Sequence, residues 1–139
     1  MNAMRKTRTR LQRVTRLLGR EDGFADAIIV LPGVILIVLV ALQIALYYVG
    51  SNVAQAAATA SYSDARAYQS TPSAGHTAGN QVLKQTSGYL TSPSVEVDRA
   101  ATTVTVTVTG HAVSLLPFLT LPEVKRTITG PIERWVPAP

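Results

Sequence analysis

The sequence predicts an α+β protein with one N-terminal transmembrane helix that extends outward as a stalk, then a second helix and a small antiparallel β-sheet. Three observations lead to this fold class. Ala27–Val49 is an unbroken apolar run, seven basic side chains precede it, and valine alternates with threonine over Thr103–Thr109. The expected segments are a basic cytoplasmic tail (1–22), a transmembrane helix (23–49), an extracytoplasmic helical stalk and linker (50–72) and a small extracytoplasmic α+β domain (73–139).

The positive charge is concentrated in the first segment. Residues 1–22 hold seven Lys and Arg side chains against Glu21 and Asp22, whereas from Gly50 onward six basic residues meet five acidic ones. A nucleic-acid-binding domain would carry its basic face on the folded part, so no nucleic-acid partner is expected. The tail fits either an amphipathic helix on an anionic membrane surface or a disordered segment whose charges only set topology.

The apolar run Ala27–Val49 is long enough to cross a bilayer. Its 23 residues reach roughly 34 Å as a helix, against a hydrocarbon core of about 30 Å. Gln43 is its only strongly polar side chain, so the polar stripe of a soluble core helix is missing. Pro32 falls in the first two turns, where a missing N–H is best tolerated, and marks the start of the transmembrane helix. Tyr47 and Tyr48 are expected to anchor its far end at the membrane–water interface.

The charge distribution orients this helix. Basic residues crowd the segment before it, and the next one after it is Arg66. The positive-inside rule therefore predicts a single-pass protein of the plasma membrane, with a cytoplasmic N-terminus and an extracytoplasmic C-terminal domain. The alternative is a secretory signal cut at Ala54-Gln55-Ala56 or Ala56-Ala57-Ala58. It is less favoured because the apolar part of a signal peptide is only about 7–15 residues long.

Small residues follow the apolar run. Neither Pro nor Gly interrupts Ser51–Ser70, so the helix is expected to continue outward as a stalk. Alanines recurring at three and four residues allow close helix–helix approach and so suggest an assembly surface, although a solvated alanine-rich helix has the same pattern. A break is expected over Ser70–Gly75, and a second helix over Thr77–Leu90.

The last third alternates with a period of two, as β-strands do. The valines would pack on the second helix and the threonines would meet water. A short hairpin loop is expected over Asp98–Ala101, and an apolar loop broken by prolines over Ser114–Pro122. The expected strands are Val95–Val97, Thr103–Thr109 and Val124–Thr129.

No motif for catalysis is found. The sequence holds no cysteine, no nucleophile elbow, no phosphate loop and no paired metal ligands. The two histidines are isolated, with His76 in an expected flexible segment and His111 at a strand end. We therefore expect no enzyme, no catalytic, cofactor-binding or metal-binding residue, no cofactor and no small-molecule substrate.

Asp26 immediately precedes the apolar run. Near the cytoplasmic interface a carboxylate costs much less than at the bilayer centre. The residue is either an N-terminal acid stabilised by the helix dipole or an acid that pairs with a cation on a neighbouring subunit. Physics alone favours the first.

Several short motifs occur together in a recognisable order. Gly23-Phe24-Ala25-Asp26 is followed by Ile29-Val30-Leu31-Pro32, and alanines follow the apolar helix. Matching segments near the C-terminus are Val104–Gly110, Ser114-Leu115-Leu116-Pro117, Leu121-Pro122 and Thr129-Gly130-Pro131-Ile132-Glu133-Arg134. From Gly23 onward this layout resembles the TadE-like family, the TadE/TadG-type minor pilin-like proteins of tight-adherence (Flp-type) pilus assembly.

The resemblance implies a pilin-like fold and a non-catalytic role in a pilus or a related envelope secretion apparatus. The implied partners are the lipid bilayer, other pilin-like or pilus assembly membrane proteins, and a prepilin peptidase. In the family the cut follows the glycine, and an acid at mature position five neutralises a neighbour's N-terminal amine. Here a cut after Gly23 makes Phe24 the first residue but Asp26 only the third, whereas alignment on Pro32 places the cut after Glu21.

Gly23, Phe24 and Asp26 remain the candidates for processing and assembly. A functional alternative is a secreted or membrane-tethered extracellular binding module, whose apolar helix is only an anchor or a signal sequence.

Overall fold

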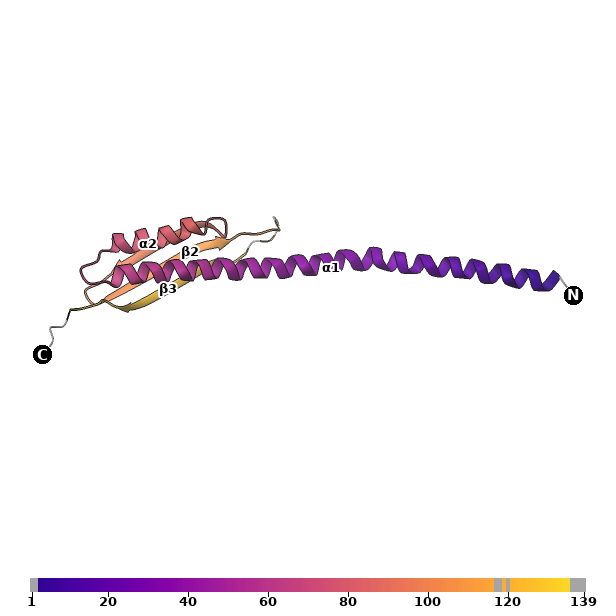
Figure 1. Cartoon of the computed structure of the whole chain (residues 1–139), viewed down its shortest axis with the longest axis horizontal. Helices are drawn as coiled ribbons and strands as arrows, with labels where there is room; N and C mark the ends of the chain where they lie inside the picture. Colours follow the sequence, from indigo (N-terminus) through magenta and orange to yellow (C-terminus); the bar gives the residue numbers. More distant parts are fainter. Residues whose placement is uncertain (1–2, 117–118, 120, 136–139) are drawn as a thin grey trace. The chain divides into compact units, whose positions relative to one another are not determined.

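The computed structural model of the chain describes the backbone of residues 3–116, 119 and 121–135, and within these ranges the side chains from Ala27 onward. A long apolar N-terminal helix, a second helix and a three-stranded antiparallel sheet confirm the predicted α+β class. The elements are α1 (Ala3–Arg66), α2 (Pro72–Gln85), β1 (Leu90–Arg99), β2 (Thr103–Ala112) and β3 (Glu123–Pro131) (Figure 1). The chain divides into two compact units, Met1–Ala41 and Leu42–Pro139, and each is described by itself.

The sheet of the second unit has its strands in chain order, β1-β2-β3, with both pairs antiparallel. Val106 of β2 stands opposite Val97 of β1 and Ile128 of β3. Because side chains alternate along a strand, the valines share one face and the threonines the other, as the sequence predicts. The threonine face forms its own cross-strand contacts. The hydroxyls of Thr105 and Thr129 lie 3.1 Å apart and those of Thr107 and Thr127 lie 3.2 Å apart.

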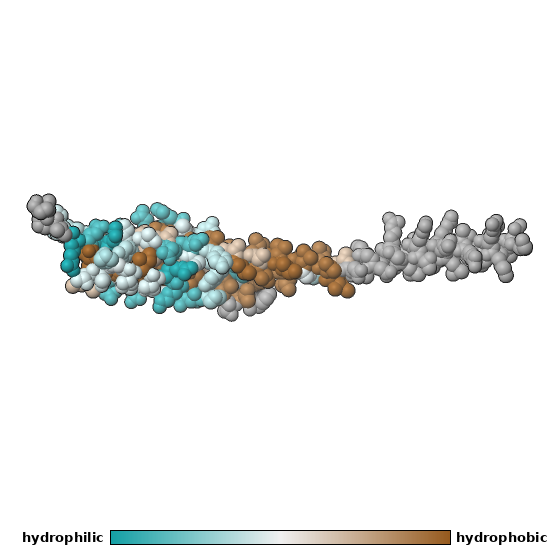
Figure 2. Space-filling view, turned by 90° about the horizontal axis from the view of Figure 1, so that it is seen from below, coloured by the Kyte–Doolittle hydropathy of each residue, from teal (hydrophilic) through white to brown (hydrophobic). Residues whose placement is uncertain are grey.

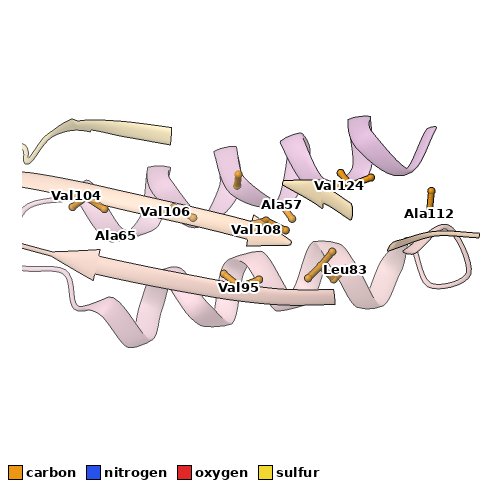
Figure 3. Packing of buried hydrophobic residues seen from close by; sticks show 11 residues of the cluster. Ala57, Ala65, Leu83, Val95, Val104, Val106, Val108, Ala112 and Val124 are labelled. Atoms are coloured by element: carbon orange, nitrogen blue, oxygen red, sulfur yellow. The ribbon is translucent and has the colours of Figure 1, made fainter. Parts of the chain in front are cut away.

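The valine face packs against both helices (Figure 3). The sequence led us to expect only the second helix there. A face three strands wide exposes more apolar surface than one short helix can cover, and the C-terminal part of α1 covers the remainder. The buried hydrophobic core comprises Ala54, Ala57, Ala58, Ala65, Leu83, Val95, Val104, Val106, Val108, Ala112 and Val124.

The stretch of α1 that we expected to be a separate stalk belongs to this unit. Ala54, Ala57, Ala58 and Ala65 are fully buried against the sheet and α2. They recur at three, four and seven residues, so they form one face of the helix. The structure therefore draws the boundary of the folded unit at Leu42 and not near residue 73.

The second helix begins and ends earlier than the expected Thr77–Leu90. The Thr71 side chain accepts a hydrogen bond from the Ala74 amide at 3.3 Å, and Pro72 occupies the first turn. An N-cap threonine followed by proline is a strong helix start, which overrides the linker-like composition of this segment. Beyond Thr86 the chain turns through Gly88 at φ +103°, a conformation that favours glycine and ends the helix.

The strands are longer than the alternating runs in the sequence. Asp98 and Arg99 still pair with Thr105 and Val104, so the connection is Ala100–Thr102 and not the expected loop Asp98–Ala101. β1 starts at Leu90 and carries an irregularity between Thr91 and Ser94, around Pro93. Pro93 is tolerated because β1 is an edge strand. Strand ends of mixed composition do not alternate, and for this reason the sequence pattern misses them.

Candidate functional site

The apolar stretch of α1 is the most unusual surface of the molecule. From Ala27 to Ala41, in the first unit, most of its large hydrophobic side chains are exposed, and the face seen in Figure 2 is strongly apolar along this stretch. By length and composition α1 can cross a membrane, and only 6% of its most apolar window is buried. That low burial distinguishes it from the core helix of a soluble protein, which would be covered. The most exposed members are Ile28, Ile29, Val30, Leu31, Val34, Ile35, Leu36, Ile37 and Val38.

The predicted processing and assembly residues Gly23, Phe24 and Asp26 lie on the backbone of α1, and their side chains are outside the described residues. Pro32, predicted to mark the start of the membrane-crossing part, lies inside α1, which begins at Ala3. Because proline has no N–H, the carbonyl of Ile28 lacks its usual helical donor. The helix nevertheless continues through Pro32.

The two tyrosines proposed as interface anchors have different surroundings. Tyr48 is 64% exposed, whereas Tyr47 is half-buried and packs against the core of the second unit. Their rings meet edge to face, with centroids 6.3 Å apart. Tyr48 is therefore the one whose ring is free for an interface, and Tyr47 also belongs to the fold.

Gln43 is 2% exposed, although it is the one strongly polar side chain of the apolar run. Its Nε2 donates to the carbonyl of Val113 at 3.2 Å, and its Oε1 accepts from the amide of Leu115 at 2.8 Å. The Ser114 hydroxyl lies 3.4 Å from the same Oε1. Sequence reasoning noticed Gln43 and gave it no role. A lone amide within an apolar helix was the signal, because such a group is retained only where it finds partners.

Two arginines on the inner face of the sheet bind α1 and the residues that follow it. Arg126 donates from its guanidinium to the hydroxyl of Ser51, which is buried. Arg99 donates to the carbonyl of Ser70 and, at 3.5 Å, to that of Ala67. These carbonyls follow the C-terminal end of α1, where orphan carbonyl groups favour a cation.

Small residues let α1 and α2 approach closely. A Cβ added to Gly75 would lie 2.8 Å from the Cβ of Ala65, and one added to Gly79 would lie 3.2 Å from the Cβ of Ser61. Ser61 also donates its hydroxyl to the carbonyl of Gly75 at 2.7 Å. The close approach that the alanine-rich stretch predicts thus occurs within the chain, and the buried alanines are not free for a partner. Ala56 is exposed.

The two histidines lie on different elements, and His111 stands opposite Glu123 of β3. His76 lies in α2, not in the expected flexible segment, and His111 lies on β2. In the part of the chain that the structure describes, no three His, Asp or Glu side chains form a group able to hold a metal ion.

Comparison of the chain with protein-family models, with curated proteins and with solved structures finds no match. The geometry of the described residues gives one candidate site, the exposed apolar stretch of α1.

Proposed function

We propose that the chain is a membrane-anchored, non-catalytic component of a tight-adherence (Flp-type) pilus or a related envelope secretion apparatus, similar to TadE-like proteins. The observation that carries this proposal is an exposed apolar helix that continues without a break into a small folded unit. The motif order from Gly23 to Arg134 adds the family resemblance. In the proposed topology the arginine-rich tail is cytoplasmic and the sheet is outside.

The contacts of α1 support retention of the helix over removal as a secretory signal. A cut at Ala54-Gln55-Ala56 or at Ala56-Ala57-Ala58 would fall within the buried face of α1. It would remove Gln43 and Ser51, whose side chains bond to the rest of the unit. A signal peptide is discarded without damage to the mature fold, whereas this segment supplies part of the core.

Asp26 tests the assembly role. In native membranes, the full-length chain carrying Asp26→Ala should lose crosslinks to neighbouring membrane proteins while still inserting, because the proposed acid neutralises a neighbour's amine. Asp64→Ala is the matched control, since it removes an exposed acid near the other end of α1 and should leave the crosslinks in place. Crosslinks that survive Asp26→Ala, measured by affinity purification and mass spectrometry, would remove Asp26 from the assembly mechanism.

The mass of the mature N-terminus tests processing separately. Recovery of the chain from membranes with an intact Met1 supports a simple anchor, and a start at Phe24 supports prepilin processing. A start at Asp22 supports the register aligned on Pro32. A start near Ala57 would make the chain a secreted protein and would overturn the proposed anchor.

A second candidate, a tethered binding module, is favoured by one observation. The threonine face of the sheet is on the side away from both helices, and it presents Glu96, Asp98 and Lys125 beside the threonine hydroxyls. Replacing residues 1–41 by an unrelated membrane helix distinguishes the two candidates. Full function with the foreign helix would favour the binding module, and loss of assembly would favour the pilus component.

A further inference from the structure

The turn after β2 is apolar and partly exposed. We call Val113–Leu116 together with Leu119 the apolar turn. Leu115 is 51% exposed and Leu119 is 40% exposed. The sequence from Val113 to Pro122 contains no charged residue. Two exposed leucines in a segment without charge make this turn a candidate for contact with an apolar medium.

Hydrogen bonds to Gln43 fix the position of the apolar turn along α1. The Gln43 side chain bonds to both the Val113 carbonyl and the Leu115 amide. Gln43 lies six residues before Val49, which is about 9 Å of helix rise inside the apolar run. The turn therefore lies beside a part of α1 that is itself apolar and exposed, where Leu42 and Ile44 flank Gln43 at 48% and 53% exposure.

Tyr48 gives an independent marker of the interface. Exposed tyrosines prefer the boundary between acyl chains and water. Tyr48 follows Gln43 by five residues, about 7.5 Å along the helix. If the residues of α1 before Tyr48 are in the membrane, then the apolar turn lies on the same side of Tyr48 as the acyl chains.

The length of the helix agrees with this depth. From Ala27 to Leu42 the helix would cover only about 24 Å, less than a hydrocarbon core of about 30 Å. The helix that starts at Ala27 crosses the whole hydrocarbon core only when residues beyond Gln43 are included. The level of Gln43 is therefore within the hydrocarbon region and not outside it.

Four of the five backbone amides of the apolar turn are paired within the chain. Buried or lipid-exposed backbone groups must be paired within the protein. The amides of Val113, Leu115, Leu116 and Leu119 all have acceptors. The acceptors are the Tyr89 carbonyl at 3.4 Å, Gln43 Oε1 at 2.8 Å, the Ser114 hydroxyl at 3.3 Å and the Leu116 carbonyl at 3.0 Å.

We propose that the apolar turn inserts into the lipid bilayer beside α1, as a second membrane contact of the folded unit. Gln43 holds the two contacts at the same depth. A single helix leaves a domain free to tilt over the membrane, whereas two contacts restrict its orientation. This inference rests on the proposed membrane anchoring of α1, and the occupant is the acyl chains of the same bilayer that α1 spans.

Depth-dependent fluorescence quenching tests the proposal on the full-length chain. The native tryptophan is first removed as Trp135→Phe, and single tryptophans are then introduced by Leu115→Trp, Ile35→Trp or Tyr68→Trp. Each variant is reconstituted into phosphatidylcholine vesicles with or without bromine on the acyl chains. Ile35→Trp reports the anchor, and Tyr68→Trp, 58% exposed beyond the end of α1, reports the aqueous side.

We expect acyl-chain bromine to quench Leu115→Trp as it quenches Ile35→Trp, with Tyr68→Trp unaffected. Quenching of Ile35→Trp without quenching of Leu115→Trp would overturn the second contact and leave the anchor intact. Absence of quenching at both positions would overturn the anchor itself.

A protein occupant would give a different result. If a second copy covered the turn, Leu115→Trp would emit at short wavelength without bromine quenching, and dilution with lipid would shift the emission. That outcome would also overturn the proposal. Should Leu115→Trp fail to fold, Leu119→Trp reports the same surface and is expected to be quenched in the same way.

Discussion

Two parts of one helix have opposite environments. Over Ala27–Ala41 most side chains of α1 are large and exposed, whereas over Leu42–Arg66 one face carries small residues that are fully buried. Alanine, serine and glycine let the helix axis approach the sheet, and bulky residues would hold it away. The comparison teaches that side-chain size, and not apolarity alone, decides which part of this helix joins the fold.

The largest expected effect comes from cutting the chain between these two parts. Removal of residues 1–41 should leave the second unit able to unfold cooperatively, because that unit begins at Leu42. Removal of residues 1–56 also deletes Gln43, Ser51 and Ala54, so the truncated chain should lose its cooperative transition. Thermal unfolding in mild detergent, followed by far-ultraviolet circular dichroism, measures the cooperativity of both truncated chains. Equal melting curves for the two truncations would contradict the role given to α1.

Replacing Gln43 by leucine should have the next largest effect. The Leu115 amide and the Val113 carbonyl would lose their hydrogen-bond partner. The free energy of unfolding should fall by about 1–3 kcal/mol for each group left unsatisfied. Hydrogen exchange in lipid nanodiscs should show faster exchange at Leu115. Gln55→Leu, at an exposed position of the same helix, is the control and should change neither the free energy of unfolding nor the exchange rate at Leu115. Unchanged protection at Leu115 in Gln43→Leu would show that the turn is held by other contacts.

Enlarging a buried alanine should destabilise the second unit by a smaller amount. Ala57→Leu inserts a bulky side chain where no exposed area remains, at a cost of about 1–3 kcal/mol in unfolding free energy. Its exposed neighbour gives a matched control, because Ala56→Leu adds the same atoms to the surface. Chemical denaturation in detergent compares them. Equal stability of the two variants would mean that α1 does not pack on the sheet.

The smallest effect is expected at the exposed ion pair of the second unit. Arg66 and Glu133 lie 3.0 Å apart, with side chains 41% and 51% exposed. Glu133→Gln should cost at most about 1 kcal/mol, and the difference should shrink as salt is added. Glu96→Gln, on the outer face of the sheet, is the control. A salt-independent loss would contradict an electrostatic role for this pair, because Glu133→Gln retains the backbone bond from the amide of residue 133 to the Arg66 carbonyl.

Much of the architecture follows from periodicity. The alternation of Thr103–Thr109 predicts both the strand and the separation of its valine and threonine faces, because a strand places neighbours on opposite sides. The length and polarity of Ala27–Val49 predict a helix able to span a membrane. The start of α2 was misplaced because the cap formed by Thr71 and Pro72 resembles a linker in composition, and its effect depends on local hydrogen bonding.

The sequence by itself determined the order of the elements, the apolar helix and the two faces of the sheet, since these depend on spacing along the chain. Only the tertiary structure decided that the alanines of α1 belong to the core and that Gln43 meets a turn 70 residues away. Both depend on contacts between distant segments. Alanine spacing is the same in a solvated helix and in a packed one, and a lone glutamine reveals its partners only when the fold brings them to it.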